Sequence, residues 1–402
     1  MNQRSPTSFP LAEMRRIVHD LFQPDPRFYW TDFLITLTIA YVSAGIYFLS
    51  PLFSPQQIGG LVVAGFALHR LANYIHEVAH LHAKRSLRSF QITWDILVGI
   101  PTLMPSYFFH THMSHHNTNH FGTSSDCEYV PLGRGPLRNI GWFLCQVFLQ
   151  PLFVLFRHTL VTPISFLHPR LRQWVLGHLS SFVFVWPCPR QIPADAPRAA
   201  WAAMDVACWL RASAIFVLVA LDVNPWYRIP QLYLLAIFAL SLHYVRSLTA
   251  HRYLSDGHKM PFDAQLMDSI DITGHRVLTE LFYPVGLRYH ALHHLFPAMP
   301  YHNLGIANRR LLAELPPDSP YRQLVYPGFW SVIWQLFRDA RESTQPARGQ
   351  VLAEADLDGH RASPVRPPAS GTPWLNYDRV EPSAELSGEW RGSDWNREMP
   401  SS

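Results

Sequence analysis

Uncharged apolar stretches separated by short polar turns begin near residue 33. Residues 33–53, FLITLTIAYVSAGIYFLSPLF, carry no charge, and about 20 apolar residues are enough for a helix to cross the hydrocarbon core of a bilayer. After the segment SPQQ, residues 58–76, IGGLVVAGFALHRLANYIH, are again largely apolar. The pattern predicts two transmembrane helices that form a hairpin.

A second apolar pair lies further along the chain. Residues 203–221, AMDVACWLRASAIFVLVAL, and residues 230–246, PQLYLLAIFALSLHYVR, flank the turn DVNPWYR. This pair predicts a second hairpin and a total of four spans. We therefore expect an all-α integral membrane protein, with two transmembrane helical hairpins in a domain at residues 31–342 and a cytosolic segment at residues 1–30.

Two further segments are expected to lie on the membrane surface. Residues 141–156, GWFLCQVFLQPLFVLF, are apolar enough to cross, but a single crossing would put the histidine-rich segments before and after it on opposite sides of the membrane. We therefore expect an interfacial helix there, as around residues 172–186.

From residue 343 onward the chain is polar and rich in Pro, Ser and Gly, which predicts a disordered tail at residues 343–402.

The distribution of basic residues sets the expected orientation. The hairpin turns hold few charges, whereas the segment between the hairpins contains Lys84, Arg85, Arg88, Arg134, Arg138, Arg157, Arg170, Arg172, Arg190 and Arg198. Because cytoplasmic loops carry an excess of Lys and Arg, this segment and both termini are expected in the cytoplasm. The first thirty residues are polar, so we expect no cleavable signal peptide.

The composition agrees with a membrane protein. Only 15% of the 402 residues are charged and 48% are hydrophobic, while soluble domains have roughly 25% charged residues. The net charge is only +4, and the sequence contains no basic stripe interleaved with aromatic residues. Nucleic acid is therefore not an expected partner. The four cysteines form no CxxC pair, which indicates neither a disulfide framework nor an iron–sulfur cluster.

The candidate chemistry lies in the histidines, which gather near the cytoplasmic ends of the expected spans. Four groups stand out: HEVAHLH at 76–82, HTHMSHH at 110–116, the single His251, and HALHH at 290–294. Two groups repeat the spacing i, i+3, i+4, which puts three imidazoles on one face of a helix. At this histidine content, chance would produce the spacing roughly 0.07 times per chain.

The number of histidines narrows the choice of metal. Imidazole binds iron, zinc and copper alike, but nine ligands are too many for one tetrahedral zinc and suit two octahedral irons. The candidate ligands are His76, His80, His112, His115, His116, His251, His290, His293 and His294. Two membrane hairpins would therefore carry a cytosolic, histidine-rich di-iron cap.

The order HxxxH, HxxHH, single His, HxxHH around two hairpins resembles the membrane fatty-acid desaturase and hydroxylase superfamily. The segments SHHNTNHFGTSSDCEY and YPVGLRYHALHHLFPAMPYHNL resemble the surroundings of the second and third histidine boxes in bacterial members. The similarity covers about residues 30–315. It implies that the nine histidines bind iron, with His251 as an additional ligand before the third box. Ser247 stands where some members have Asn, which leaves the tenth ligand open.

Two ferrous ions in such a site can split dioxygen and oxidise an unactivated C–H bond, and a fatty acyl chain is the substrate that we expect. The resemblance favours desaturation, because desaturation is common in the superfamily. Fatty acyl hydroxylation and oxidative decarboxylation to a terminal alkene remain alternatives, since all three begin with the same hydrogen abstraction. The chain lacks nucleotide and iron–sulfur motifs, which predicts a separate ferredoxin- or rubredoxin-like electron donor with its reductase.

Two alternatives from other classes use the same residues. HEVAH fits an intramembrane zinc protease in which His76 and His80 bind the metal and Glu77 activates water, but that enzyme has no use for either HxxHH group. A metal-storage or transport protein would use the histidines as a reservoir. That class fits poorly, because the spans contain no acidic pathway.

Several polar residues near the boxes are expected to support the site or to face solvent. His82, His110, His120 and His302 lie beside a box but off its spacing, and we expect outer or surface roles for them. Asp126 and Glu128 either orient box histidines or belong to a solvated loop. Arg70 and Arg211 lie inside the expected spans, where a long basic side chain commonly extends to the headgroups.

Overall fold

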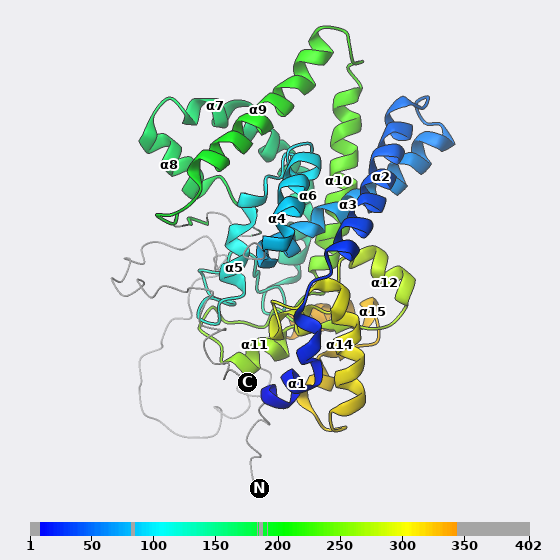
Figure 1. Cartoon of the computed structure of the whole chain (residues 1–402), viewed down its shortest axis with the longest axis vertical. Helices are drawn as coiled ribbons and strands as arrows, with labels where there is room; N and C mark the ends of the chain where they lie inside the picture. Colours follow the sequence, from blue (N-terminus) through cyan, green and yellow to red (C-terminus); the bar gives the residue numbers. More distant parts are fainter. Residues whose placement is uncertain (1–8, 82–84, 183, 185–187, 191, 344–402) are drawn as a thin grey trace, which may run out of the picture. The chain divides into compact units, whose positions relative to one another are not determined.

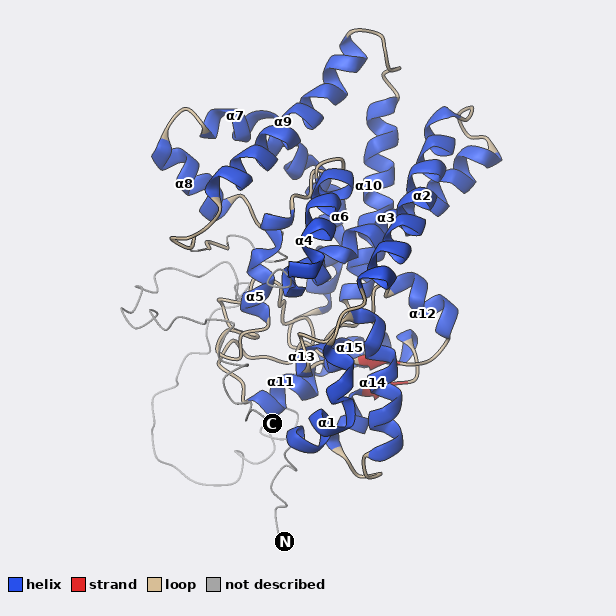
Figure 2. Ribbon diagram, viewed as in Figure 1, coloured by secondary structure: helices blue, strands red, loops and turns tan. Residues whose placement is uncertain are grey.

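The protein is described by a computed structural model at residues 9–81, 85–182, 184, 188–190 and 192–343 (Figure 1). The chain divides into two units, and all of these residues belong to the first, residues 1–348. Helices dominate, and two short strands, β1 (Asp271–Ile272) and β2 (Val325–Tyr326), pair in parallel (Figure 2). The expected all-α fold class is confirmed. His82 and the expected disordered tail beyond residue 343 lie outside the described residues.

The first expected hairpin consists of α2 (Pro26–Leu49) and α3 (Pro55–Leu81). Helix α2 begins before its first apolar run, because the Asp25 side chain accepts a hydrogen bond from the Arg27 amide at 2.9 Å and Pro26 occupies the first helical position. The inward face of α2 recurs every three or four residues, at Tyr29, Phe33, Thr36, Ala40, Ser43 and Tyr47. The opposite face exposes apolar side chains along the helix, as expected for contact with lipid: Leu34, Ile35, Ile39, Val42 and Ile46.

The second hairpin consists of α9 (Arg198–Ala220) and α10 (Arg228–Ser247). Its turn lies at the same end of the unit as the turn between α2 and α3 (Figure 1). Residues such as Leu210, Val217 and Leu234 are exposed on this hairpin. With their length and apolar surface, the two hairpins make this an integral membrane protein.

Helix α6 (Leu137–Phe156) covers the interfacial helix expected at residues 141–156. With its continuation to residue 165, it is one of five helices in the described residues that are long and apolar enough to cross a membrane. It packs on α10, where the Tyr233 hydroxyl donates to the Phe148 carbonyl at 2.8 Å. Helices α6, α9 and α10 lie between His116 and His251 in the sequence, yet both histidines belong to the same site. An even number of these three helices must therefore cross the membrane. With α9 and α10 as a crossing hairpin, α6 enters and leaves on one side.

The remaining helices connect the hairpins, and most of them lie at the ends of the hairpins opposite the two turns (Figures 1 and 2). Helix α8 covers part of the surface segment expected around residues 172–186. The bounds of these helices are α1 Leu11–Val18, α4 Arg88–Trp94, α5 His112–His115, α7 Thr162–Ser165, α8 Pro169–His178, α11 Phe262–Asp268, α12 Arg276–Phe282, α13 His290–Leu295, α14 Tyr301–Glu314 and α15 Phe329–Ser343.

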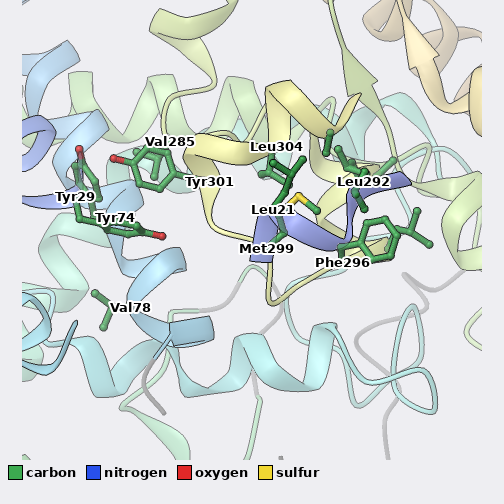
Figure 3. Packing of buried hydrophobic residues seen from close by; sticks show 14 of the residues in the cluster. Leu21, Tyr29, Tyr74, Val78, Val285, Leu292, Phe296, Met299, Tyr301 and Leu304 are labelled. Carbon is green, nitrogen blue, oxygen red and sulfur yellow. The ribbon is translucent and has the colours of Figure 1, made fainter. Parts of the chain in front are cut away.

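A large apolar core joins α2 and α3 to α1, α13 and α14. Figure 3 shows residues of this core, among them Leu21, Tyr29, Tyr74, Leu292, Phe296 and Leu304. At its edge the Asp32 carboxylate accepts hydrogen bonds from Arg70 at 2.7 Å and from the hydroxyls of Tyr74 at 2.5 Å and Tyr301 at 2.7 Å. Arg70 also pairs with Glu280 at 3.1 Å. Arg70 is therefore paired with two carboxylates, which the sequence did not indicate.

A disulfide joins Cys127 to Cys188, whose Cα atoms lie 6.0 Å apart. The sequence indicated no disulfide framework, and for this pair that interpretation is wrong, because a sequence separation of 61 hides the proximity of the two cysteines. Cys145 and Cys208 are free thiols. The disulfide fixes a loop that carries two carboxylates of the site described next.

Candidate metal centre

Nine histidine side chains meet in two groups at the ends of the hairpins opposite their turns. The potential ligand atoms of each group lie within 4.8 Å of one another. One group, here called the five-histidine group, contains His76, His80, His112, His116 and His293. The other, the four-histidine group, contains His115, His251, His290 and His294. The structure thus brings together all nine residues that the sequence singled out.

The two HxxHH segments contribute to both groups in opposite ways. In the α5 segment, the i and i+4 histidines, His112 and His116, join the five-histidine group while His115 joins the other. In α13 the i and i+4 histidines join the four-histidine group while His293 crosses to the other. Residues i and i+4 lie above one another on a helix, whereas i+3 is rotated away from them. Each short helix therefore faces two centres at once.

The geometry and protonation of these side chains fit metal ions. Neighbouring Nε2 atoms lie 2.9–3.2 Å apart in both groups, and nitrogens at about 2.1 Å from one octahedral metal would lie about 3.0 Å apart. Burial lowers the pKa of His290, His293 and His294 well below the usual range, which keeps the rings neutral and their lone pairs free. Both ring nitrogens of His76 are buried without a hydrogen-bond partner among the described residues.

Carboxylates hold the outer nitrogens of the second box. The Nδ1 atoms of His112 and His115 lie 2.8 Å from Glu128 and Asp126, respectively. Each contact fixes the ring so that Nε2 faces the centre, as outer partners of metal-bound imidazoles do. Of the two interpretations of Asp126 and Glu128, the structure supports the orienting one. Burial raises the pKa of Glu128 to about 8, and cations in the adjacent groups would favour its charged form.

His251 receives a partner that sequence reasoning did not identify. Its Nδ1 lies 3.2 Å from the Ser269 hydroxyl and 3.7 Å from the Asp268 carboxylate, and residues 251 and 269 form an isolated antiparallel bridge. Asp268 also accepts a hydrogen bond from the Tyr129 hydroxyl at 2.9 Å. No spacing in the sequence marks this contact, because it depends on how the segment after α10 folds against α11.

The other histidines near the boxes have separate surroundings. His110 is exposed beside the Trp201 ring, at 5.6 Å between ring centroids, and His120 is half-buried. His302 accepts a hydrogen bond from the Asp25 amide at 3.2 Å and thereby attaches the start of α2 to α14. None of these three belongs to either histidine group.

Glu77 faces away from the histidines. Its carboxylate accepts hydrogen bonds from the Tyr29 hydroxyl and, at 3.4 Å, from the Tyr301 amide. These partners belong to α2 and α14, on the side of α3 opposite the groups. The position contradicts the zinc-protease alternative, in which this glutamate must activate a metal-bound water.

A cavity of about 680 Å³ leads from the histidines into the membrane part, a volume typical of ligand sites. At its inner end it is lined by His76, His112, His115, His251 and His290. Further out the lining is mainly apolar and comes from all four hairpin helices, with Ala40, Leu68, Ile215 and Leu240 as examples. A long hydrocarbon chain fits such a space.

Comparison with known proteins agrees with this architecture. The sequence profile of the fatty acid desaturase family, described as "Fatty acid desaturase", matches residues 53–325. A ceramide hydroxylase of Caulobacter vibrioides (strain NA1000 / CB15N) is 36% identical over 340 residues, which cover 83% of this chain and 95% of the relative. The chain is therefore a membrane oxidoreductase acting on lipids, and it belongs to the fatty acid desaturase family.

Proposed function

We propose that this protein is a di-iron lipid hydroxylase that acts on a ceramide or a closely related long-chain lipid. The likeness to a ceramide hydroxylase over 83% of the chain carries this proposal. It favours the hydroxylase alternative over the fatty acyl desaturation expected first from the sequence. The reaction converts R–H, O2, two electrons and two protons into R–OH and water.

The nine histidines would hold two irons, five ligands on one and four on the other. Bound irons supply the reductive activation of dioxygen. Glu128 and Asp126 keep the outer nitrogens of His112 and His115 protonated, so that the inner nitrogens remain available to metal. The resemblance left the tenth ligand open at Ser247. The Ser247 hydroxyl donates to the His243 carbonyl at 2.9 Å.

The cavity would position the substrate. Its apolar walls take up the hydrocarbon chain from the bilayer, and its inner end presents one carbon to the histidine groups. The apolar lining also excludes water from the reacting carbon. Because methylenes offer no polar handle, the chain is held by shape and the polar part of the lipid by other groups.

Electrons would come from a separate ferredoxin- or rubredoxin-like protein with its reductase. The basic residues between the two hairpins support a cytoplasmic location for the histidine groups and for both termini, in a bacterial inner membrane. An acidic donor would approach the same basic surface.

The test is lipid mass spectrometry of a bacterial host that expresses the protein together with a ceramide source, beside a His115→Ala variant. A ceramide one oxygen heavier, absent from the variant, is the expected result. A product two hydrogens lighter would instead mean desaturation, and a terminal alkene one carbon shorter would mean decarboxylation. Either outcome contradicts the proposed hydroxylation, as does an unchanged lipid profile from folded, iron-containing protein.

A further inference from the structure

Two charged side chains, Arg246 and Glu128, line the cavity together with the histidines. Glu128 contacts His112 through Oε2, and its Oε1 is buried without a hydrogen-bond partner among the described residues. The inner end of the cavity is therefore polar, whereas most of the remaining lining is apolar.

Arg246 has few hydrogen-bond partners for a half-buried cation. It lies in the last turn of α10, and its Nε is buried without a partner among the described residues. Its Nη2 makes a long contact of 3.4 Å with the Ser247 hydroxyl. Within the described part of the chain it forms no ion pair. An enclosed guanidinium without acceptors is costly, so the position calls for an acceptor from a ligand.

The chemistry of the pair defines that ligand. A guanidinium offers only donors and a carboxylate oxygen offers only an acceptor. A group that accepts from Arg246 and donates to Glu128 satisfies both, and a neutral amide or hydroxyl does so. A plain methylene would leave both side chains without a partner.

Depth in the membrane points to the same ligand. Arg246 lies at the inner end of α10, beside the last turn of α3, where the spans reach the cytoplasmic surface. A lipid has its polar group at that level and its hydrocarbon chains deeper in the bilayer. The cavity has the same polarity, since its apolar part extends along α3 and α10 away from the histidines.

We propose that Arg246 and Glu128 bind the amide or hydroxyl group of the lipid substrate. This inference rests on the proposed function and adds the position of the reaction. The polar group sits beside the histidine groups, so the oxidised carbon lies only a few bonds from it. The distance from the polar group therefore determines which carbon is oxidised, and the methyl end lies in the apolar part of the cavity.

Arg211 is the competing candidate for binding the polar group. It also lines the cavity, but it lies near the middle of α9, beside Tyr41, and so deeper in the membrane. If Arg211 bound the polar group, the lipid would enter in the reverse direction and the oxidised carbon would lie far along the chain.

The decisive experiment varies chain length in the wild-type protein. Membranes from the expressing host receive ceramides of two acyl lengths and two long-chain base lengths, with a reduced ferredoxin, and tandem mass spectrometry locates the new hydroxyl. We expect it at a constant, small number of carbons from the amide. A position constant from the methyl end would overturn the inference and leave the proposed function intact. Absence of any oxygenated lipid would overturn the proposed function itself.

Variants separate binding from structure. Arg246→Gln is expected to raise the apparent KM for ceramide about 10- to 100-fold, as expected for loss of a charge-assisted hydrogen bond, with iron content unchanged and partial recovery in Arg246→Lys. Arg338→Gln, which changes an exposed arginine of α15 outside the cavity lining, is expected to stay within about twofold of the wild type. Loss of iron in Arg246→Gln, an unchanged KM in Arg246→Gln, or a larger rise in KM in Arg211→Gln than in Arg246→Gln would each contradict the assignment.

Discussion

Replacing Asp126 by asparagine is the sharpest test of how the histidines are held. Asp126 is 2% exposed, and both of its oxygens face donors. Oδ2 accepts from Gly122 at 3.0 Å and contacts His115 Nδ1 at 2.8 Å, while Oδ1 accepts from the Glu128 amide at 3.2 Å. Asparagine keeps one oxygen. In either orientation its NH2 group meets at least one of these donors.

The expected loss follows from those contacts. If the amide nitrogen faces His115, the ring must accept there, its proton moves to Nε2, and that nitrogen no longer binds metal. If it faces the Glu128 amide, two buried donors oppose each other and the loop shifts. Loss of an outer partner costs about 10- to 100-fold in metal affinity, or about 1.4–2.7 kcal/mol.

The assay is retained iron, measured by mass spectrometry of purified protein after dialysis against graded chelator. Asp126→Asn should lose iron at a chelator concentration about 10- to 100-fold lower than the wild type needs. Asp256→Asn, which changes an exposed carboxylate near Arg134, should behave like the wild type. Equal retention in Asp126→Asn and Asp256→Asn would refute the orienting role of Asp126.

Three further substitutions test other parts of the structure. Asp205→Asn weakens a fully buried ion pair with Arg157, 3.2 Å apart, so thermal unfolding in nanodiscs should show a loss of about 3–5 kcal/mol; an unchanged midpoint would contradict the buried pair. Glu77→Gln should retain iron and lipid product, since Glu77 faces away from the histidines; complete loss of product with iron retained would favour a catalytic glutamate. Cys127→Ser, Cys188→Ser and the double variant should lose equal stability, about 2–4 kcal/mol, and additive losses would show that the two sulfurs are not bonded.

The histidine ligand set was predictable because helical spacing is visible in one dimension. HxxHH at 112–116 and at 290–294 puts three imidazoles on one face whatever the rest of the chain does. The sequence could not say which histidine serves which centre, because that depends on how α5 and α13 face each other. The hairpins were equally visible in the sequence. Helix α2, however, begins before its apolar run, because Asp25 caps its first turn.

The features that the sequence did not reveal depend on contacts between distant segments. The position of Cys188 beside Cys127 follows from the path of the chain between α8 and α9, which no local pattern records. The pairing of Arg70 with Glu280 depends on α12 returning to the side of α3. Helix α6 has the composition of a span, and only the convergence of His116 and His251 limits its path.

The exchange of histidines between α5 and α13 makes the two centres interdependent. A metal in the five-histidine group fixes His112 and His116 on α5 and His293 on α13, and so also orders His115, His290 and His294 for the neighbouring centre. Binding of the first ion already costs the conformational entropy of ordering α5 and α13, so binding of the second ion costs less. Iron uptake should therefore be cooperative, with chains holding either no iron or two and few holding one. Such a protein passes through no long-lived state in which a single iron meets dioxygen without its neighbour.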